Sequence, residues 1–171
     1  MNVTLVMATS LNGMIATKDG SEDFLSDKNW AEFIKHVQES GCLIWGRKTY
    51  EAVQKWDPKY LESLSSLKKI VVSNSQMSLS GGFEIASSPE NALKKLGEYG
   101  LNNVVLSGGA TINYEFAKKG LINNVVFFVN PSILGDGISV ITNSDLLIKL
   151  QLEKVEIIDE DIVVLNYKVI K

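Results

Sequence analysis

The sequence predicts a single α/β domain with three layers, in which a mixed, mainly parallel sheet is flanked by helices and closed by a C-terminal antiparallel hairpin. Up to about residue 120, short apolar runs alternate with amphipathic segments, which is the pattern of βα units. Beyond that point, strand-like runs follow one another with little helix between them. No repeat or Pro/Ser-rich linker interrupts the chain, so residues 1–171 are expected to form one domain.

The N-terminal part predicts a strand, a loop and a helix in that order. The run Val3–Thr9 is apolar and β-branched, as in a central strand. The stretch Ser10–Leu25 is polar and contains glycines, which predicts a long loop. Ser26 is a typical N-cap, apolar residues follow it at helical spacing, and Gly41 is placed to end that helix.

The middle of the chain predicts further βα units. Cys42–Trp45 indicates a buried strand, which leads into a helix at about Thr49–Trp56. Ser88 is the expected N-cap of a helix that runs to about Tyr99, with a proline at its first position. The other elements expected in this part are the strands Lys69–Ser73 and Asn103–Ser107 and a helix that ends near Lys119.

The C-terminal part predicts strands that are not separated by helices. Val125–Val129, Val155–Ile158 and Ile162–Ile170 are apolar, β-branched runs. The acidic segment Asp159–Asp161 lies between the last two and is expected to be the turn of a terminal hairpin. This pattern favours antiparallel pairing at the end of the sheet.

The composition excludes several classes of function. The chain has one cysteine, Cys42, and one histidine, His36, so it has neither a disulfide framework nor a Cys/His metal cluster. A Ser–His–Asp triad would need His36 as its base, and His36 falls on the polar face of the first predicted helix. No EF-hand spacing is present, so we expect no metal site.

The charge and the N-terminal segment indicate the partners and the location. A net charge of −3 argues against sequence-independent binding of nucleic acid. The apolar run Val3–Ala8 is too short for a signal peptide or a membrane span. We therefore expect a cytoplasmic enzyme that acts on a small molecule and has no nucleic-acid or membrane partner.

Three predicted strands run into small or polar residues, at Trp45–Thr49, Val72–Ser75 and Leu106–Thr111. In open α/β sheets ligands bind outside the carboxyl ends of the strands, where glycines and helix N-termini allow a phosphate to approach the backbone. The only arginine of the chain, Arg47, lies in the first of these segments. Together they favour a phosphate-bearing cofactor held by separate loops, because neither a Rossmann fingerprint nor a Walker loop is present.

The same segments resemble the dihydrofolate-reductase-like superfamily. The resemblance is carried by Gly46–Glu51 (GRKTYE), by Ser73–Ser75 and by the run SGGATINY at 107–114. Two further segments are similar to the reductase domain of riboflavin biosynthesis, namely Ser10–Ala16 (SLNGMIA) and Pro131–Gly137 (PSILGDG). The match spans nearly the whole chain in the same order and implies the dihydrofolate-reductase-like fold.

The resemblance implies NADPH as the hydride donor. The end of the first strand and the loop after it would border the nicotinamide, and the start of the second helix would meet the phosphates. The third strand end would lie beside the adenosine, and the glycine run would cradle the pyrophosphate. The residues assigned to the cofactor in this way are Ala8, Thr9, Ile15, Ala16, Gly46, Arg47, Lys48, Thr49, Ser73, Asn74, Ser75, Ser107, Gly108, Gly109, Ala110 and Thr111.

The resemblance also assigns residues to the substrate. Ser10 and Asn12 belong to the shared signature after the first strand, and Phe24 takes the place of a family tryptophan. Lys59 would supply a point charge for a ribose phosphate, because the family's arginines are missing. The family commonly has glutamate before the Gly-Gly pair, where this chain has Ser107.

The catalytic acid of folate reductases lies on the first helix, at a position that is Trp30 in this chain. Asp27, one turn earlier on the same face, is therefore the candidate catalytic residue. An acid in a first helical turn is also favoured by the helix dipole alone, and the sequence leaves both roles open.

The resemblance leads to one main function and two alternatives. The main one is an NADPH-dependent reductase similar to 5-amino-6-(5-phosphoribosylamino)uracil reductase of riboflavin biosynthesis, which transfers hydride to a pyrimidine or ribosylamino substrate. The alternatives are a dihydrofolate reductase that acts on a pterin and a module that binds NADPH without turnover. The resemblance also suggests a homodimer that packs through the apolar C-terminal strands.

Overall fold

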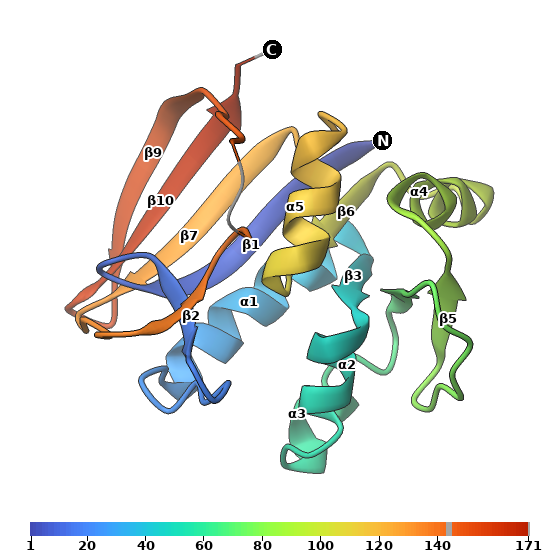
Figure 1. Cartoon of the computed structure of the whole chain (residues 1–171), viewed down its shortest axis with the longest axis horizontal. Coiled ribbons are helices and arrows are strands. Elements are labelled where there is room, and N and C mark those ends of the chain that lie inside the picture. Colours follow the sequence, from blue (N-terminus) through green and yellow to red (C-terminus); the bar gives the residue numbers. More distant parts are fainter. Residues whose placement is uncertain (143–144, 171) are drawn as a thin grey trace.

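The computed structural model describes residues 1–142 and 145–170, and within them an eight-stranded sheet has the order β5-β4-β3-β6-β1-β7-β10-β9 (Figure 1). A separate two-stranded sheet pairs β2 with β8. The strands are β1 (Asn2–Ser10), β2 (Met14–Thr17), β3 (Cys42–Gly46), β4 (Lys68–Val72), β5 (Phe83–Ala86), β6 (Asn103–Leu106), β7 (Asn124–Asn130), β8 (Gly137–Ser139), β9 (Leu150–Ile158) and β10 (Ile162–Val169). The helices are α1 (Asp27–Ser40), α2 (Arg47–Val53), α3 (Pro58–Glu62), α4 (Pro89–Glu98) and α5 (Ala110–Lys118).

The strand directions divide the large sheet into two parts. β5, β4, β3, β6, β1 and β7 pair in parallel, so their carboxyl ends lie at one edge. β10 pairs antiparallel with both β7 and β9. This arrangement confirms the predicted mixed, mainly parallel sheet with a C-terminal antiparallel hairpin.

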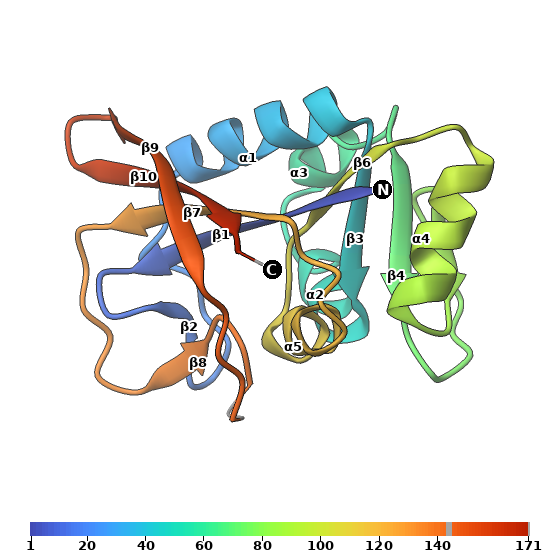
Figure 2. The same ribbon diagram turned by 90° about the horizontal axis from the view of Figure 1, so that it is seen from above.

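Helices cover both faces of the parallel part, which gives the three predicted layers (Figure 2). On one face, α1 and α2 pack their buried side chains, Phe33 and Tyr50 among them, against the sheet. On the other face, α4 and α5 do the same with residues such as Leu96 and Phe116. The alternating side chains of the central strands supply both cores, as the period of two in a β-strand requires.

The helix boundaries follow the capping residues of the sequence. Ser26 is the N-cap of α1, and Gly41 closes that helix with a left-handed φ of 76°. Ser88 caps α4 by accepting a hydrogen bond from the Asn91 N–H, with Pro89 at the first helical position. These predictions are confirmed because each signal acts within a few residues of its own helix end.

The predicted loop Ser10–Leu25 is wrong in part, because it contains β2. This strand of four residues pairs with β8, which lies more than 100 positions away in the sequence. The short elements β5, β8 and α3 were likewise not predicted. Short elements of this kind depend on pairing and packing with distant segments, so their own residues carry little signal.

Two further boundaries differ from the prediction. Helix α2 begins at Arg47 rather than at Thr49. Strand β9 begins at Leu150 rather than at Val155, and its register against β10 shifts between Asn166 and Tyr167. The extra residue breaks the alternation of apolar and polar side chains, which hides the first half of β9 from a periodicity analysis.

Candidate ligand site at the carboxyl edge of the parallel strands

A pocket of about 730 Å³ opens at the carboxyl edge of the parallel strands. The ends of β1 and β3 and the segment after β6 form its floor, and α1, α2 and the loop after β2 form its sides. Its volume lies in the range of small-molecule and cofactor sites. Its position is the one that ligands take in open parallel sheets, because loops from neighbouring strands converge there.

The first wall of the pocket, here called the glycine wall, consists of Thr49, Ser107, Gly108 and Gly109. Backbone hydrogen bonds hold it in place. The Gly46 N–H donates to the Gly108 carbonyl at 2.7 Å, and the Gly108 N–H donates to Asn113 Oδ1 at 3.2 Å. The peptide between Gly108 and Gly109 is cis.

The glycine wall has no space for side chains. Gly108 has a left-handed φ of 84°, and a Cβ atom there would lie 3.3 Å from Met7 Cε. A Cβ atom at Gly109 would lie 3.3 Å from Thr49 Oγ1. Because α5 begins at the next residue, its first N–H groups, which have no partner inside the helix, are at this end of the pocket.

The second wall, here called the acidic aromatic wall, consists of Glu22, Asp27, Trp30, Trp56 and Tyr60. Its three rings meet nearly at right angles. The centroids of Trp30 and Tyr60 are 5.1 Å apart at 80°, those of Trp56 and Tyr60 5.8 Å at 75°, and those of the two tryptophans 6.0 Å at 78°. Such edge-to-face contacts are favourable, and all three rings contribute to the lining of the pocket.

Two carboxyl groups of this wall differ in their surroundings. The Tyr60 hydroxyl donates to Asp27 Oδ1 at 2.8 Å, and this bond raises the pKa of Tyr60. Glu22 is partly buried, and desolvation raises the pKa of its carboxyl to about 7. Among the residues that the structure describes, the Glu22 side chain has no hydrogen bond or ion pair. Glu22 was not among the predicted residues, because it lies in a polar loop whose place beside the pocket depends on the pairing of β2 with β8.

A buried amide pair positions the first turn of α1, which carries Asp27 and Trp30. Asn29 Nδ2 donates to Asn130 Oδ1 at 2.8 Å, and Asn130 Nδ2 donates back to Asn29 Oδ1 at 3.1 Å. Asn130 Nδ2 also reaches the carbonyl of Thr9 at 3.1 Å. The pair therefore joins α1 to the carboxyl ends of β1 and β7.

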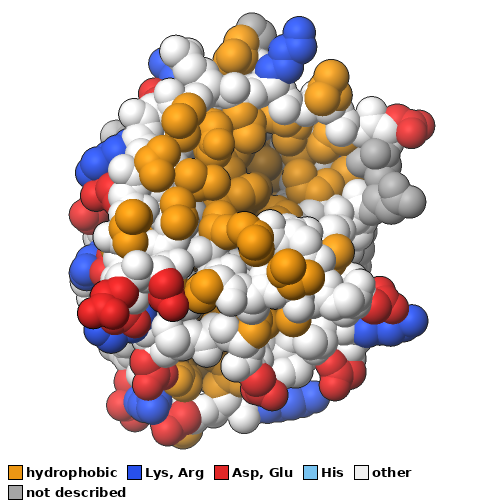
Figure 3. All heavy atoms as spheres, turned by 90° about the vertical axis from the view of Figure 1, so that its left-hand side faces the viewer, with side chains coloured by type: hydrophobic (Ala, Val, Ile, Leu, Met, Phe, Trp, Pro, Cys, Tyr) orange, Lys and Arg blue, Asp and Glu red, His pale blue; other side chains and the backbone are white. Residues whose placement is uncertain are grey.

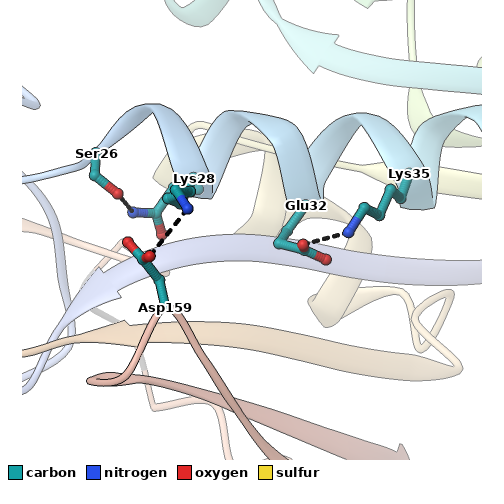
Figure 4. A network of polar contacts seen from close by, with 6 residues as sticks. Ser26, Lys28, Glu32, Lys35 and Asp159 are labelled. Carbon is teal, nitrogen blue, oxygen red and sulfur yellow. Dashed lines mark hydrogen bonds and ion pairs between the residues drawn. The ribbon is translucent and has the colours of Figure 1, made fainter.

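Charged contacts on the outer side of α1 add little to this positioning. Figure 4 shows the Lys28 ammonium reaching the Asp159 carboxylate in the turn between β9 and β10, at 3.0 Å. Further along the helix, Lys35 is paired with Glu32. Both pairs are largely exposed to solvent, and exposed ion pairs contribute about 0–1 kcal/mol.

Seven of the residues predicted for the site line the pocket. They come from β1, β2, α1, α2 and the segment after β6, so the fold brings together residues that are far apart in the sequence. The seven are Ala8, Ile15, Asp27, Thr49, Ser107, Gly108 and Gly109.

The other predicted residues do not line the pocket. The Ser10 hydroxyl donates to Asn12 Oδ1 at 2.8 Å, and Asn12 Nδ2 donates to the Leu134 carbonyl. Both side chains therefore stabilise the turn between β1 and β2. Lys59 lies over the ring of Tyr60. The remaining ones lie beside the pocket lining or at the end of β4, and they are Thr9, Ala16, Phe24, Gly46, Arg47, Lys48, Ser73, Asn74, Ser75, Ala110 and Thr111.

His36 differs from its prediction as a solvated side chain. It is half-buried, with its ring 5.7 Å from that of Phe128, and burial lowers its pKa. It does not line the pocket. Within residues 1–142 and 145–170, no group of three or more His, Cys, Asp or Glu side chains is placed to hold a metal ion. In the same residues, no helix has both the length and the apolar character that crossing a membrane requires.

The fold and the pocket define the class of the protein: a three-layer α/β domain with a pocket at the carboxyl edge of the parallel strands. The chain belongs to the family of the RibD C-terminal domain, whose family model matches residues 1–164. The expected family and the dihydrofolate-reductase-like fold are thereby confirmed.

Individual relatives are distant. The riboflavin biosynthesis protein RibD of Actinobacillus pleuropneumoniae is 33% identical over 88 residues, which is 47% of this chain and 23% of that protein. A pyrimidine reductase-like protein from Corynebacterium diphtheriae has a similar structure, with a TM-score of 0.77, 14% identity and coverage of 99% of this chain and 92% of that one.

A further solved structure is that of a diaminohydroxyphosphoribosylaminopyrimidine deaminase/5-amino-6-(5-phosphoribosylamino)uracil reductase from Thermotoga maritima. It matches with a TM-score of 0.75 and 20% identity, over 99% of this chain and 56% of that one. The chain thus spans about a quarter of the first of these relatives and somewhat more than half of the last.

Proposed function

We propose that the protein is an NADPH-dependent oxidoreductase that reduces an imine-like carbon of a nitrogen heterocycle. The observation that supports this best is the pocket itself, because its glycine wall closes the carboxyl ends of β3 and β6 where α5 begins. Membership of a family that includes RibD proteins supports the same reaction class. The proposed substrate is a ribosylamino pyrimidine, related to the phosphoribosylamino uracil that the name of the Thermotoga reductase gives.

The residues at the glycine wall fit a dinucleotide. Gly108 and Gly109 present backbone without side chains, and the free N–H groups at the start of α5 favour an anion. Arg47 and Lys48 are exposed at the start of α2, next to Thr49, where they would meet phosphate groups. NADPH would supply the hydride at this site.

The rest of the pocket would orient the substrate and exclude water. Trp30, Trp56 and Tyr60 offer ring faces and edges for stacking a planar ring. Asp27 holds the Tyr60 hydroxyl, so its proposed catalytic role includes orienting this phenol toward the pocket. Positioning of this kind is the main contribution of a protein to cofactor-based hydride transfer.

The test is a fluorescence titration of the purified protein with NADPH and with NADH, for the wild type and for Arg47→Ala. We expect NADPH to bind more tightly than NADH, and Arg47→Ala to weaken NADPH binding by about 5–10-fold, as the loss of one charge-assisted contact does. Glu51→Ala is the matched control, because it removes the partner that Arg47 has at 3.0 Å and leaves the arginine in place. Failure to bind either cofactor would reject the proposed function.

A module that binds NADPH without turnover is the second candidate. It is favoured by the neutral Ser107 in front of Gly108, whose Oγ lies 3.9 Å from Met7 Sδ rather than against a charged group. This candidate predicts cofactor binding without NADPH oxidation in the presence of either a ribosylamino pyrimidine or dihydrofolate. Oxidation with dihydrofolate alone would instead favour a pterin reductase.

The C-terminal strands support a homodimer as the proposed assembly. By register, Leu152, Val155 and Ile157 share one face of β9 and β10, where they are 52%, 50% and 69% exposed. Figure 3 shows hydrophobic side chains gathered over this side of the molecule. Exposed apolar patches of this kind are typical of interfaces. Light scattering tests the proposal, and Ile157→Glu is expected to give a monomer. A cytoplasmic location stays a prediction.

A further inference from the structure

The charges around the pocket are all of one sign. Four carboxyl side chains line it, Glu22, Asp23, Asp27 and Asp57, and the lining within the described residues includes no Lys, Arg or His. The four carboxyls are not arranged as a metal site in the part of the chain that the structure describes. A ligand in this pocket therefore meets carboxyl groups, and no cationic side chain of the described lining contacts it.

Two cations close to the acidic aromatic wall are paired with carboxylates of the chain. Lys59 Nζ lies 3.7 Å from Asp57 Oδ2, and Lys28 pairs with Asp159 at 3.0 Å. A ribose phosphate in the acidic aromatic half would face like charges, and such juxtapositions oppose binding. This half of the pocket selects against a phosphorylated substrate.

The rings of the acidic aromatic wall favour positive charge. Trp30, Trp56 and Tyr60 line the pocket together and meet nearly at right angles. Their faces carry partial negative charge, which attracts cations. The chain itself shows this, because Lys59 Nζ lies 4.9 Å from the centroid of the Tyr60 ring.

Glu22 is the most buried of the pocket carboxyls that are available to a ligand. Asp27 is bonded to Tyr60, and Asp57 accepts from the Lys59 N–H. The side chains of Glu22 and Asp23 have no such partner among the described residues, and Asp23 is exposed to solvent whereas Glu22 is partly buried. The raised pKa of Glu22, caused by desolvation, indicates a carboxyl that holds a proton near neutral pH. A neighbouring cationic nitrogen would restore the charged form.

We propose that the substrate is a planar nitrogen heterocycle that bears an imine group and no phosphate, and that Glu22 is the catalytic residue that protonates the imine nitrogen. The inference rests on the proposed function. The proton of the Glu22 carboxyl passes to the imine nitrogen and gives an iminium ion, whose carbon then accepts the hydride from NADPH. The products are the amine and NADP⁺, and water returns a proton to the Glu22 carboxylate.

The first experiment compares 5-amino-6-ribosylaminouracil with its 5′-phosphate, each present with NADPH, and follows NADPH oxidation by absorbance. We expect kcat/KM to be at least tenfold higher for the compound without phosphate. Raising the salt concentration should narrow the difference, because it screens the repulsion. A preference for the phosphorylated compound would overturn the proposal.

Two variants test the residue. Glu22→Lys should reduce at least tenfold the ratio of kcat/KM for the compound without phosphate to kcat/KM for the phosphorylated one. Glu62→Lys makes the same charge change on α3, outside the pocket lining, and should leave this ratio unchanged. Glu22→Gln keeps the size of the side chain and should lower kcat/KM at least tenfold. An unchanged preference in Glu22→Lys, or unchanged kcat/KM in Glu22→Gln, would contradict the proposal.

The pH profile separates protonation from packing. In the wild type, kcat/KM should fall as pH rises above about 7, because Glu22 then loses its proton. Asp23, Asp27, Asp57 and Tyr60 are the other titratable groups that face this space, and Glu22→Gln keeps all of them. In Glu22→Gln, kcat/KM should no longer fall as the pH rises. If kcat/KM still fell in this variant, another group would be the one that loses the proton.

A binding measurement keeps the two proposals distinct. Quenching of tryptophan fluorescence reports binding of each uracil compound to the protein saturated with NADPH, even without turnover. No binding of the compound without phosphate would overturn the substrate inference. The NADPH titration described above is independent of it and tests the oxidoreductase proposal alone.

Discussion

The two walls of the pocket are built in opposite ways. The glycine wall is made of backbone at the ends of two buried strands, and hydrogen bonds between β3 and the segment after β6 fix it. The acidic aromatic wall is made of side chains from the loop after β2, from α1 and from the segment after α2, and a buried amide pair ties the first turn of α1 to the sheet. A backbone wall suits a constant ligand such as a cofactor, whereas a side-chain wall can change with the substrate.

The largest expected effect is at the glycine wall. Gly108→Ala should destabilise the protein by about 2–4 kcal/mol, because it combines left-handed backbone strain with crowding against Met7. It should also weaken NADPH binding at least tenfold. Urea unfolding and fluorescence titration measure the two effects.

Gly100→Ala is the matched control for this prediction. Gly100 has a similar φ of 77°, and a Cβ atom there would meet nothing within 4 Å. We expect only the backbone strain to act here, so the free energy of unfolding should fall by about 1–2 kcal/mol and NADPH binding should be unchanged. Equal losses in both variants would show that crowding at the glycine wall is unimportant.

The acidic aromatic wall should be disturbed most by Asn130→Ala. The change leaves the buried Asn29 amide and the Thr9 carbonyl without their partner, and we expect a loss of about 2–3 kcal/mol in the free energy of unfolding. Catalytic efficiency should fall while NADPH affinity stays within about twofold, since α1 carries no part of the glycine wall. Thermal unfolding and steady-state kinetics measure the two.

Asn124→Ala, at the other end of the same strand, serves as the control. Its amide donates to Asn2 Oδ1 at an exposed position, so its loss should cost less than about 1 kcal/mol. If Asn130→Ala were no more damaging than Asn124→Ala, the amide pair would not position α1.

The smallest effect concerns Glu22 and the dependence of stability on pH. Burial raises its pKa from 4.5 to about 7, so the folded protein binds this proton more tightly than the unfolded chain. The protonated Glu22 therefore stabilises the folded state below about pH 4.5, and this stabilisation is lost as the pH rises to about 7. The pKa shift limits the resulting loss in the free energy of unfolding to about 3 kcal/mol. Because the side chain is partly exposed, we expect a loss of about 1–2 kcal/mol.

Glu22→Gln should remove this loss, so the variant should gain stability relative to the wild type between pH 5 and pH 8. Burial lowers the pKa of His36, and this residue contributes equally to both proteins. Urea unfolding at a series of pH values measures the difference. Parallel curves for wild type and variant would show that Glu22 is not desolvated.

Much of the fold could be predicted from the sequence, because the signals for its regular part are local. The apolar run of β1, the caps Ser26 and Gly41 around α1, and Pro89 at the start of α4 act within single elements. The bulge in β9 and the short strand β2 could not be predicted, since each depends on a partner strand elsewhere in the chain.

The candidate site divides along the same line. The sequence by itself determined the glycine wall, because Gly108 and Gly109 follow a buried strand directly and their role depends on backbone. The sequence placed Asp27 in the other wall, but only the tertiary structure added the rest. Glu22 joins it from the loop after β2, and Trp56 and Tyr60 join it from the segment after α2. Side chains that converge from separate loops leave no common pattern along the chain, because their spacing is set by packing between distant elements rather than by the repeat of any one of them.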